Sequence, residues 1–172
     1  MPSSALRLEH EKFCRSVGRF VKAVGDKKAG VAVRRTAIDL TRYTTRGTPM
    51  RTGRAAAGWM PFAAAHGAPM SVSGKGAARG FREGSYSARL RGARPFVELV
   101  NQVPYIMPLE DGARPHTIRA RRAKALRFFY RGQVCFAKSV RHPGMRGYHA
   151  LRNGMSAIRR HLEDRFGGLV RP

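Results

Sequence analysis

The sequence predicts an α+β fold: a small antiparallel β-sheet with N-terminal helices and a C-terminal helix packed on it, plus a long basic loop. Helical periodicity occurs at both ends of the chain, and strand-like alternation with turn residues occurs between them. The length of 172 residues suits a single modest core. We therefore expect an N-terminal helix in residues 1–25 and one α+β domain in residues 26–172.

Three segments have apolar residues at helical spacing: residues 4–24, 28–45 and 148–166. Gly47 and Pro49 should end the second helix, since glycine followed by proline is a common helix stop. The expected buried stripes are Val33, Ala37, Leu40, Thr41 and Thr44 in the second helix, and Leu151, Met155, Ile158 and Leu162 in the last.

Strands are expected between these helices. A short one is predicted around Trp59, and side chains alternate along residues 96–103. A hairpin is predicted from residues 125–130 and 133–140, with Arg131 and Gly132 as its tight turn. Of the hairpin's three consecutive aromatic residues, we expect two to pack into a core; they are Phe128, Phe129 and Tyr130.

Residues 63–94 contain much Gly, Ala, Ser and Arg and almost no large apolar side chain, which predicts an extended basic loop. Its only acid is Glu83. Its basic residues are Lys75, Arg79, Arg82, Arg89, Arg91 and Arg94.

The charge is strongly unbalanced, with 34 Lys and Arg against 10 Asp and Glu and a formal net charge of +24. Such a chain needs nucleic acid, an anionic membrane or an acidic protein to offset its self-repulsion. A second basic group precedes the hairpin and consists of Arg114, Arg119, Arg121, Arg122, Lys124 and Arg127. No acid occurs between Asp111 and Glu163, so this is not an ordinary mixed-charge surface. Both basic groups are candidates to face DNA or a protein partner.

The residues offer little for catalysis. Acids are scarce, and Glu110 and Asp111, as neighbours in a strand, would point to opposite faces. A two-metal site is hard to build from this set, and no histidine or cysteine spacing fits zinc. We expect no enzyme activity, no metal and no cofactor. Cys14 and Cys135 are expected to be reduced, and no secretory signal or membrane span is predicted.

Three segments, in order, resemble a known family: T-P-M-R-T-G-R at 48–54, followed by a tryptophan; V-P-Y-I-M-P-L-E-D-G at 103–112; and V-R-H-P-G-M-R-G at 140–147. This order resembles the small tail-completion or neck (head–tail joining) proteins of tailed bacteriophages, a class of minor tail proteins. The residues that carry the resemblance, mainly as turn and joint residues, are Pro49, Thr52, Gly53, Trp59, Tyr105, Glu110, Gly112, His142, Pro143 and Gly144.

The resemblance implies a structural virion protein that assembles in the host cytoplasm into a ring, expected to be a hexamer. Its neighbours would be the adaptor or head-closure ring and the tail terminator or tail tube, and phage DNA would pass through its lumen. It also implies that Glu110 and Gly112 end a strand in a tight turn, and that Pro143 and Gly144 form a turn before the last helix. The alternative is a cytosolic protein that binds nucleic acid without sequence preference.

Overall fold

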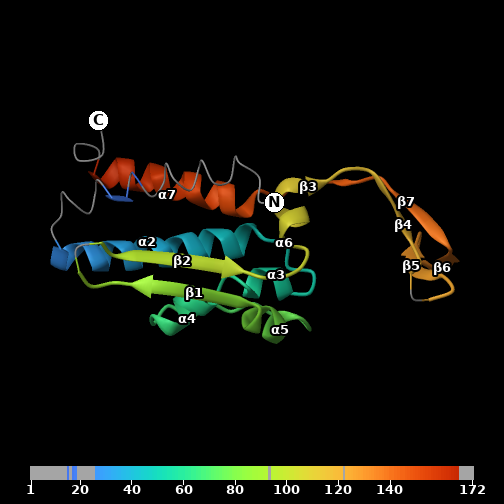
Figure 1. Ribbon diagram of the computed structural model, residues 1–172, viewed down its shortest axis with the longest axis horizontal. Coiled ribbons are helices and arrows are strands. Elements are labelled where there is room, and N and C mark those ends of the chain that lie inside the picture. The colour runs from blue at the N-terminus through green and yellow to red at the C-terminus, as the bar shows by residue number, and fades with distance from the viewer. Residues whose placement is uncertain (1–14, 16, 19–25, 93, 122, 167–172) are drawn as a thin grey trace.

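A computed structural model describes residues 15, 17–18, 26–92, 94–121 and 123–166. The α+β prediction is confirmed: helices combine with small antiparallel sheets. Figure 1 shows an elongated body from which a two-stranded ribbon projects at one end. The elements of the body are α2 (Asp26–Gly47), α3 (Arg54–Ala57), α4 (Pro61–Ala65), α5 (Ala77–Arg82), β1 (Gly84–Arg89), β2 (Phe96–Asn101), α6 (Ile106–Asp111) and α7 (Ala150–Phe166). The ribbon contains β3 (Gly112–Ala113), β4 (His116–Arg119), β5 (Leu126–Tyr130), β6 (Gln133–Ala137), β7 (Ser139–His142) and β8 (Met145–Arg146).

The central element is α2, and the prediction of a helix over 28–45 is confirmed with slightly wider bounds. Its buried stripe follows the helical repeat and includes Ala29, Val33, Ala37, Thr41 and Thr44, and the buried Thr48 follows directly after the helix. The threonines tolerate burial because their hydroxyls donate to backbone carbonyls one turn back, such as Thr41 to Ala37 at 2.8 Å and Thr48 to Thr44 at 2.7 Å.

The C-terminal helix α7 packs along α2 (Figure 1). Small residues allow this approach: a Cβ on Gly154 would lie 3.2 Å from side-chain atoms of Leu40 and Thr44. Among residues 150–162 of α7, whose burial the structure describes, the buried positions are Ala150, Gly154 and Ile158, and only Ile158 belongs to the predicted stripe. Leu151, Met155 and Leu162 are half-buried.

The other side of α2 contacts β2 and α4. Strands β1 and β2 pair antiparallel from Gly84 opposite Asn101 to Arg89 opposite Phe96, which confirms the strand predicted over 96–103. The fully buried Phe62 of α4 lies in this core and meets Tyr86 of β1 edge to face, with ring centroids 5.3 Å apart. The sheets are thus small, and α2 holds the body together.

The prediction of an extended basic loop over residues 63–94 is wrong. This segment contains the end of α4, all of α5 and all of β1. Its glycines serve close packing instead of flexibility: Gly80 is buried, and a Cβ there would lie 1.9 Å from the carbonyl oxygen of Arg54. The low apolar content reflects backbone-to-backbone contact between α5 and α3.

The strand predicted around Trp59 is also wrong. Trp59 lies in the turn between α3 and α4, both of which are alanine-rich, and alanine favours helix. Its indole Nε1 donates to the hydroxyl of Thr48 at 3.2 Å, which ties this turn to the end of α2.

The helix predicted over residues 4–24 lies almost entirely outside the described residues. Among those described, Val17 is helical and packs against the cluster of Ala29 and Val33.

Candidate functional site

The projecting ribbon, residues 112–146, is the candidate functional site and is called the arm below. Three ladders follow one another along it: β3 pairs with β8, β4 with β7 and β5 with β6, all antiparallel. Figure 1 shows the arm leaving the body beside α6 and ending at β5 and β6. A two-stranded ribbon has little core of its own, so such an arm gains stability from whatever it contacts.

The predicted hairpin at the end of the arm is confirmed. Arg131 and Gly132 both have positive φ, 50° and 80°, as a two-residue type I′ turn requires.

The prediction that two of the hairpin's three aromatic residues pack into a core is wrong. Phe129 is 72% exposed and Tyr130 is 58% exposed, and only Phe128 is half-buried. Phe129 shares its face of the ribbon with Val134 opposite it and with Phe136, which is 68% exposed. The end of the arm therefore presents an apolar face to its surroundings.

Two interruptions divide the arm. The register is the same in the first two ladders, which places Pro115 opposite Pro143 between them. Neither proline has an N–H group to donate, so the ladder is broken there. Farther out, residues 120–125 stand against Lys138 alone on the return strand. This segment carries Arg121 and Lys124, both of which are exposed.

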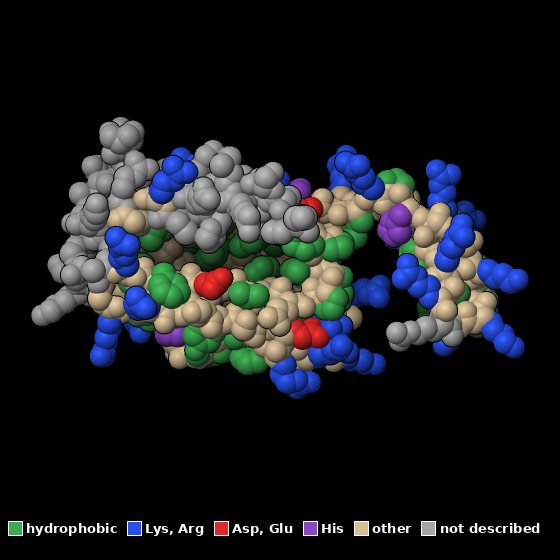
Figure 2. Space-filling view, viewed as in Figure 1, with side chains coloured by type: hydrophobic (Ala, Val, Ile, Leu, Met, Phe, Trp, Pro, Cys, Tyr) green, Lys and Arg blue, Asp and Glu red, His purple; other side chains and the backbone are tan. Residues whose placement is uncertain are grey.

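The charge of the arm has one sign. No acid occurs in residues 112–146, and every basic side chain that the structure describes in this range is exposed. These residues are Arg114, Arg119, Arg121, Lys124, Arg127, Arg131, Lys138, Arg141 and Arg146. Arg122 lies outside the described residues. In Figure 2 the Lys and Arg side chains project from the arm in several directions.

The arm is fixed to the body by Glu110. This side chain is only 6% exposed, and its carboxylate accepts hydrogen bonds from the backbone N–H groups of Leu151 and Arg152, both at 3.0 Å. These are among the N–H groups that a helix leaves unpaired at its start. His149 precedes the helix at the capping position, where histidine is a poor cap, so the carboxylate from α6 takes that role.

The backbone on both sides of the arm's base joins the same contact. The N–H of Tyr148 donates to the carbonyl of Leu109 at 2.7 Å, and that of His149 donates to the carbonyl of Glu110 at 3.1 Å. The outgoing and returning strands are therefore held together where they leave the body.

The resemblance placed Glu110 at the end of a strand, and this expectation is wrong: Glu110 lies in α6, and Gly112 follows the helix. Gly112 has φ of 86°, and a Cβ on it would lie 2.6 Å from the carbonyl oxygen of Met145, so glycine is required where the arm begins.

The expected turn at Pro143 and Gly144 lies inside the arm, between β7 and β8, instead of directly before α7. Gly144 has φ of 85° and donates its N–H to Nδ1 of His142 at 3.1 Å. His142 also stacks on His116 across the ribbon, with ring centroids 5.1 Å apart.

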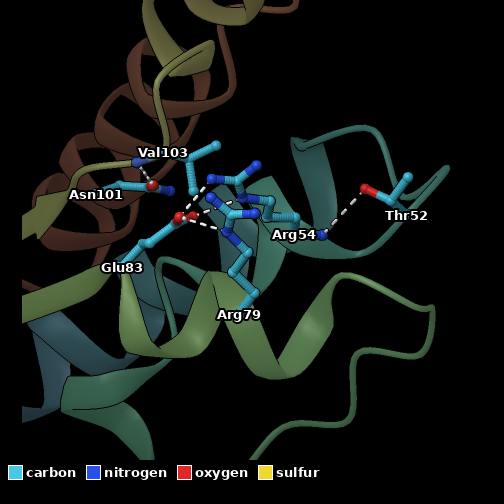
Figure 3. Close-up of polar contacts among 6 residues, drawn as sticks. All are labelled: Thr52, Arg54, Arg79, Glu83, Asn101 and Val103. Atoms are coloured by element: carbon cyan, nitrogen blue, oxygen red, sulfur yellow. Dashed lines mark hydrogen bonds and ion pairs between the residues drawn. The ribbon is translucent and has the colours of Figure 1, made fainter.

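The first motif forms a separate structural contact (Figure 3). Gly53, with φ of 70°, turns the chain into α3, and the guanidinium of Arg54 binds the carboxylate of Glu83 through two nitrogens. Arg79 donates to the same carboxylate at 3.0 Å. These hydrogen bonds, above all the one from Arg54, lower the pKa of Glu83 to about 2. Arg54 also lies over the ring of Tyr105, 5.7 Å from its centroid.

The two predicted basic groups therefore differ in setting. The group of residues 75–94 lies on the body, where Arg79 is paired with Glu83 and Arg89 lies over the ring of Phe96. Lys75, Arg82, Arg91 and Arg94 are exposed there. The group of residues 114–127 lies on the arm. The cluster predicted from the sequence does not include Arg131, Lys138, Arg141 and Arg146, which only the register of the returning strand brings alongside that group.

Within the described part of the chain, no three or more His, Cys, Asp or Glu residues are grouped so that they could hold a metal ion. The helices described here include none that is long and apolar enough to cross a membrane. A comparison with protein-family models, curated proteins and solved structures finds no match for the chain.

Proposed function

We propose that this chain is a non-enzymatic structural subunit of a tailed-phage virion, located in the neck or tail-completion region and assembled into a ring, expected to be a hexamer. Its neighbours would be the adaptor or head-closure ring and the tail terminator or tail tube. Phage DNA would pass through the ring, and the proposal includes no membrane, cofactor or catalytic step.

The single observation that carries this proposal is an arm that is held to the body at its base by Glu110 and exposes apolar side chains at its end. An exposed apolar face formed by Phe129, Val134 and Phe136 favours burial against another molecule. In a ring, the same head-to-tail contact repeats until the circle closes. The tip of one arm against the next subunit would be such a contact.

The positions of the acids support a structural role. Glu83 is bound by two arginines, and Glu110 caps α7, so both carboxylates are engaged in holding the fold. The segments that resemble the phage family also lie at joints: Gly53 before α3, Gly112 at the start of the arm and Gly144 within it.

The test is the assembly state of the purified chain and its place in virus particles. Wild-type protein should form a closed ring in negative-stain images, and Phe129→Ser with Phe136→Ser should prevent closure while leaving the helical signal in circular dichroism unchanged. The matched control is Phe81→Ser on α5, which removes one exposed aromatic ring from the body. Particles that lack the protein yet carry complete, infectious tails would refute the proposal.

The second candidate function is sequence-independent nucleic-acid binding by a cytosolic protein, and the one-signed charge of the arm favours it. It differs from the first in needing neither a ring nor a virion. A protein that stays monomeric at all concentrations, binds DNA and is absent from purified particles would support this second candidate.

A further inference from the structure

We infer that the arm binds the phosphate backbone of DNA without reading its bases, and that Arg79 of the body, which is paired with Glu83, is not part of this contact. The inference rests on the proposed function for its setting, since it names the DNA that would pass through the assembled ring as the partner of the arm. Its test uses DNA binding alone and does not depend on ring formation.

The first argument is charge complementarity. Nine described Lys and Arg side chains are exposed along the arm, and no carboxylate lies between Gly112 and Arg146 in the sequence. Duplex DNA carries one negative charge per about 1.7 Å of its axis, so a line of cations spread along a ribbon matches its form. An acidic protein partner would favour cations gathered around the apolar face of Phe129, Val134 and Phe136, as in the polar rim of a protein interface. Within β5 and β6, Arg127 alone is a cation on this face, so the cations are not gathered there.

The second argument is the arrangement of side chains on the middle ladder. Side chains that face each other across an antiparallel pair share one side of the ribbon. Arg119 lies opposite Ser139, and Arg141 lies opposite Thr117. One side of this ladder therefore contains two arginines from different strands and two hydroxyl groups, all exposed. Guanidinium and hydroxyl groups are among the donors that proteins use on phosphate oxygens.

The third argument is the residue at the apex. Arg131 has φ of 50°, in a turn position that favours Asn, Asp or Gly. Its guanidinium lies over the ring of Tyr130, 5.4 Å from the centroid, and the side chain is exposed. An unfavourable backbone conformation that places a cation in the turn between β5 and β6 suggests selection for binding rather than for stability.

Of the basic residues of the body, Arg79 is already paired with Glu83. Contact with phosphate would compete with the Arg79–Glu83 pair. The arm carries no carboxylate that could compete in this way.

The experiment measures binding of a fluorescein-labelled duplex of mixed sequence to the purified full chain, by anisotropy, across a series of salt concentrations. The first variant is Arg119→Gln with Arg141→Gln on the arm. Its matched control is Arg34→Gln with Arg35→Gln, which removes the same charge from exposed positions of α2. The arm variant should lower the slope of log affinity against log salt by about 2, one for each lost phosphate contact, and the control should leave it unchanged.

A second variant tests the inference with a substitution that should not unfold the protein. Arg131→Asn suits the positive φ of the turn and should preserve or raise thermal stability, yet it should lower the salt slope by about 1. Duplexes of different sequence should bind equally. Equal losses in the arm variant and in the α2 control would overturn the inference, because net charge alone would then explain binding. Arm variants that bind DNA with the salt slope of the wild type would also overturn it, in favour of an acidic protein neighbour.

Discussion

The carboxylate of Glu110 accepts the backbone N–H of Leu151 at 3.0 Å and, through its other oxygen, the N–H of Arg152 at the same distance. One buried side chain thus joins the end of α6 to the start of α7, on either side of the arm. The direction in which the arm leaves the body depends on this contact.

Glu110→Gln should lower the free energy of unfolding by about 1–3 kcal/mol. The amide can accept one N–H group, but its NH₂ group then faces the other N–H, which is left unpaired in a buried position. Urea denaturation measures the change. Glu98→Gln, at an exposed position of β2, is the control and should differ from wild type by less than about 0.5 kcal/mol. Equal stability of both variants would contradict the capping role.

Gly80→Ala should destabilise the body by about 1–3 kcal/mol, because the added Cβ would lie 1.9 Å from the carbonyl oxygen of Arg54 and would force α5 away from α3. Intrinsic helix propensity alone would predict the opposite sign. Thermal denaturation distinguishes the two. Arg82→Ala, an exposed position of the same helix, should have little effect.

The ion pair of Glu83 predicts a pH dependence. Its pKa is lowered from an ordinary value of 4.5 to about 2, so the pair's contribution to stability is fully present above pH about 4.5 and is lost as the pH falls toward 2. Glu83→Gln should therefore melt at a lower temperature than wild type at pH 6, and the gap should narrow between pH 4.5 and 2. The difference in melting temperature between Arg54→Gln and wild type should narrow over the same pH range. A gap that stays constant with pH would disprove the assignment.

Two phenylalanine substitutions compare how much the body and the arm contribute to the free energy of unfolding. Phe62→Ala should cost about 3–5 kcal/mol, because this side chain is fully buried. Phe136→Ala should change the unfolding free energy by less than about 0.5 kcal/mol, because Phe136 is 68% exposed. Denaturant titration of both variants at low protein concentration, where subunits do not associate, gives the comparison. A large loss for Phe136→Ala would show that the arm packs on its own body.

The elements that local pattern determines were predicted well. The repeat of Val33, Ala37 and Thr41 defines α2, and Arg131 with Gly132 defines the distal turn. Both signals depend on residues close in the sequence, as helix periodicity and tight turns do.

The failures come from tertiary contact. Residues 63–94 were predicted to be a loop because glycine-rich composition does not reveal whether a glycine is flexible or, like Gly80, pressed against another backbone. The prediction that two aromatic residues of the hairpin are buried was wrong for a related reason. Alternation shows that a ribbon has two faces, but it does not show whether either face is covered.

The candidate site was predicted in part. The count of charges identified Arg119 and Arg127, since they lie in a dense sequence cluster. Arg141 and Arg146 are isolated in the sequence, and only the strand pairing places them beside that cluster. Glu110 was recognised through the phage resemblance, but its partner on α7 is too distant in the sequence to be inferred.

The unequal strands between the second and third ladders make the outer hairpin independent of the inner arm. Residues 120–125 face Lys138 alone, so this segment can gain or lose residues without shifting the pairing on either side. Phe129 and Arg131 would keep their position and orientation, because the return strand runs from β6 to β7 through the single residue Lys138. Length variation among related chains should therefore accumulate at this one place, as a bulge that leaves the reach of the arm unchanged.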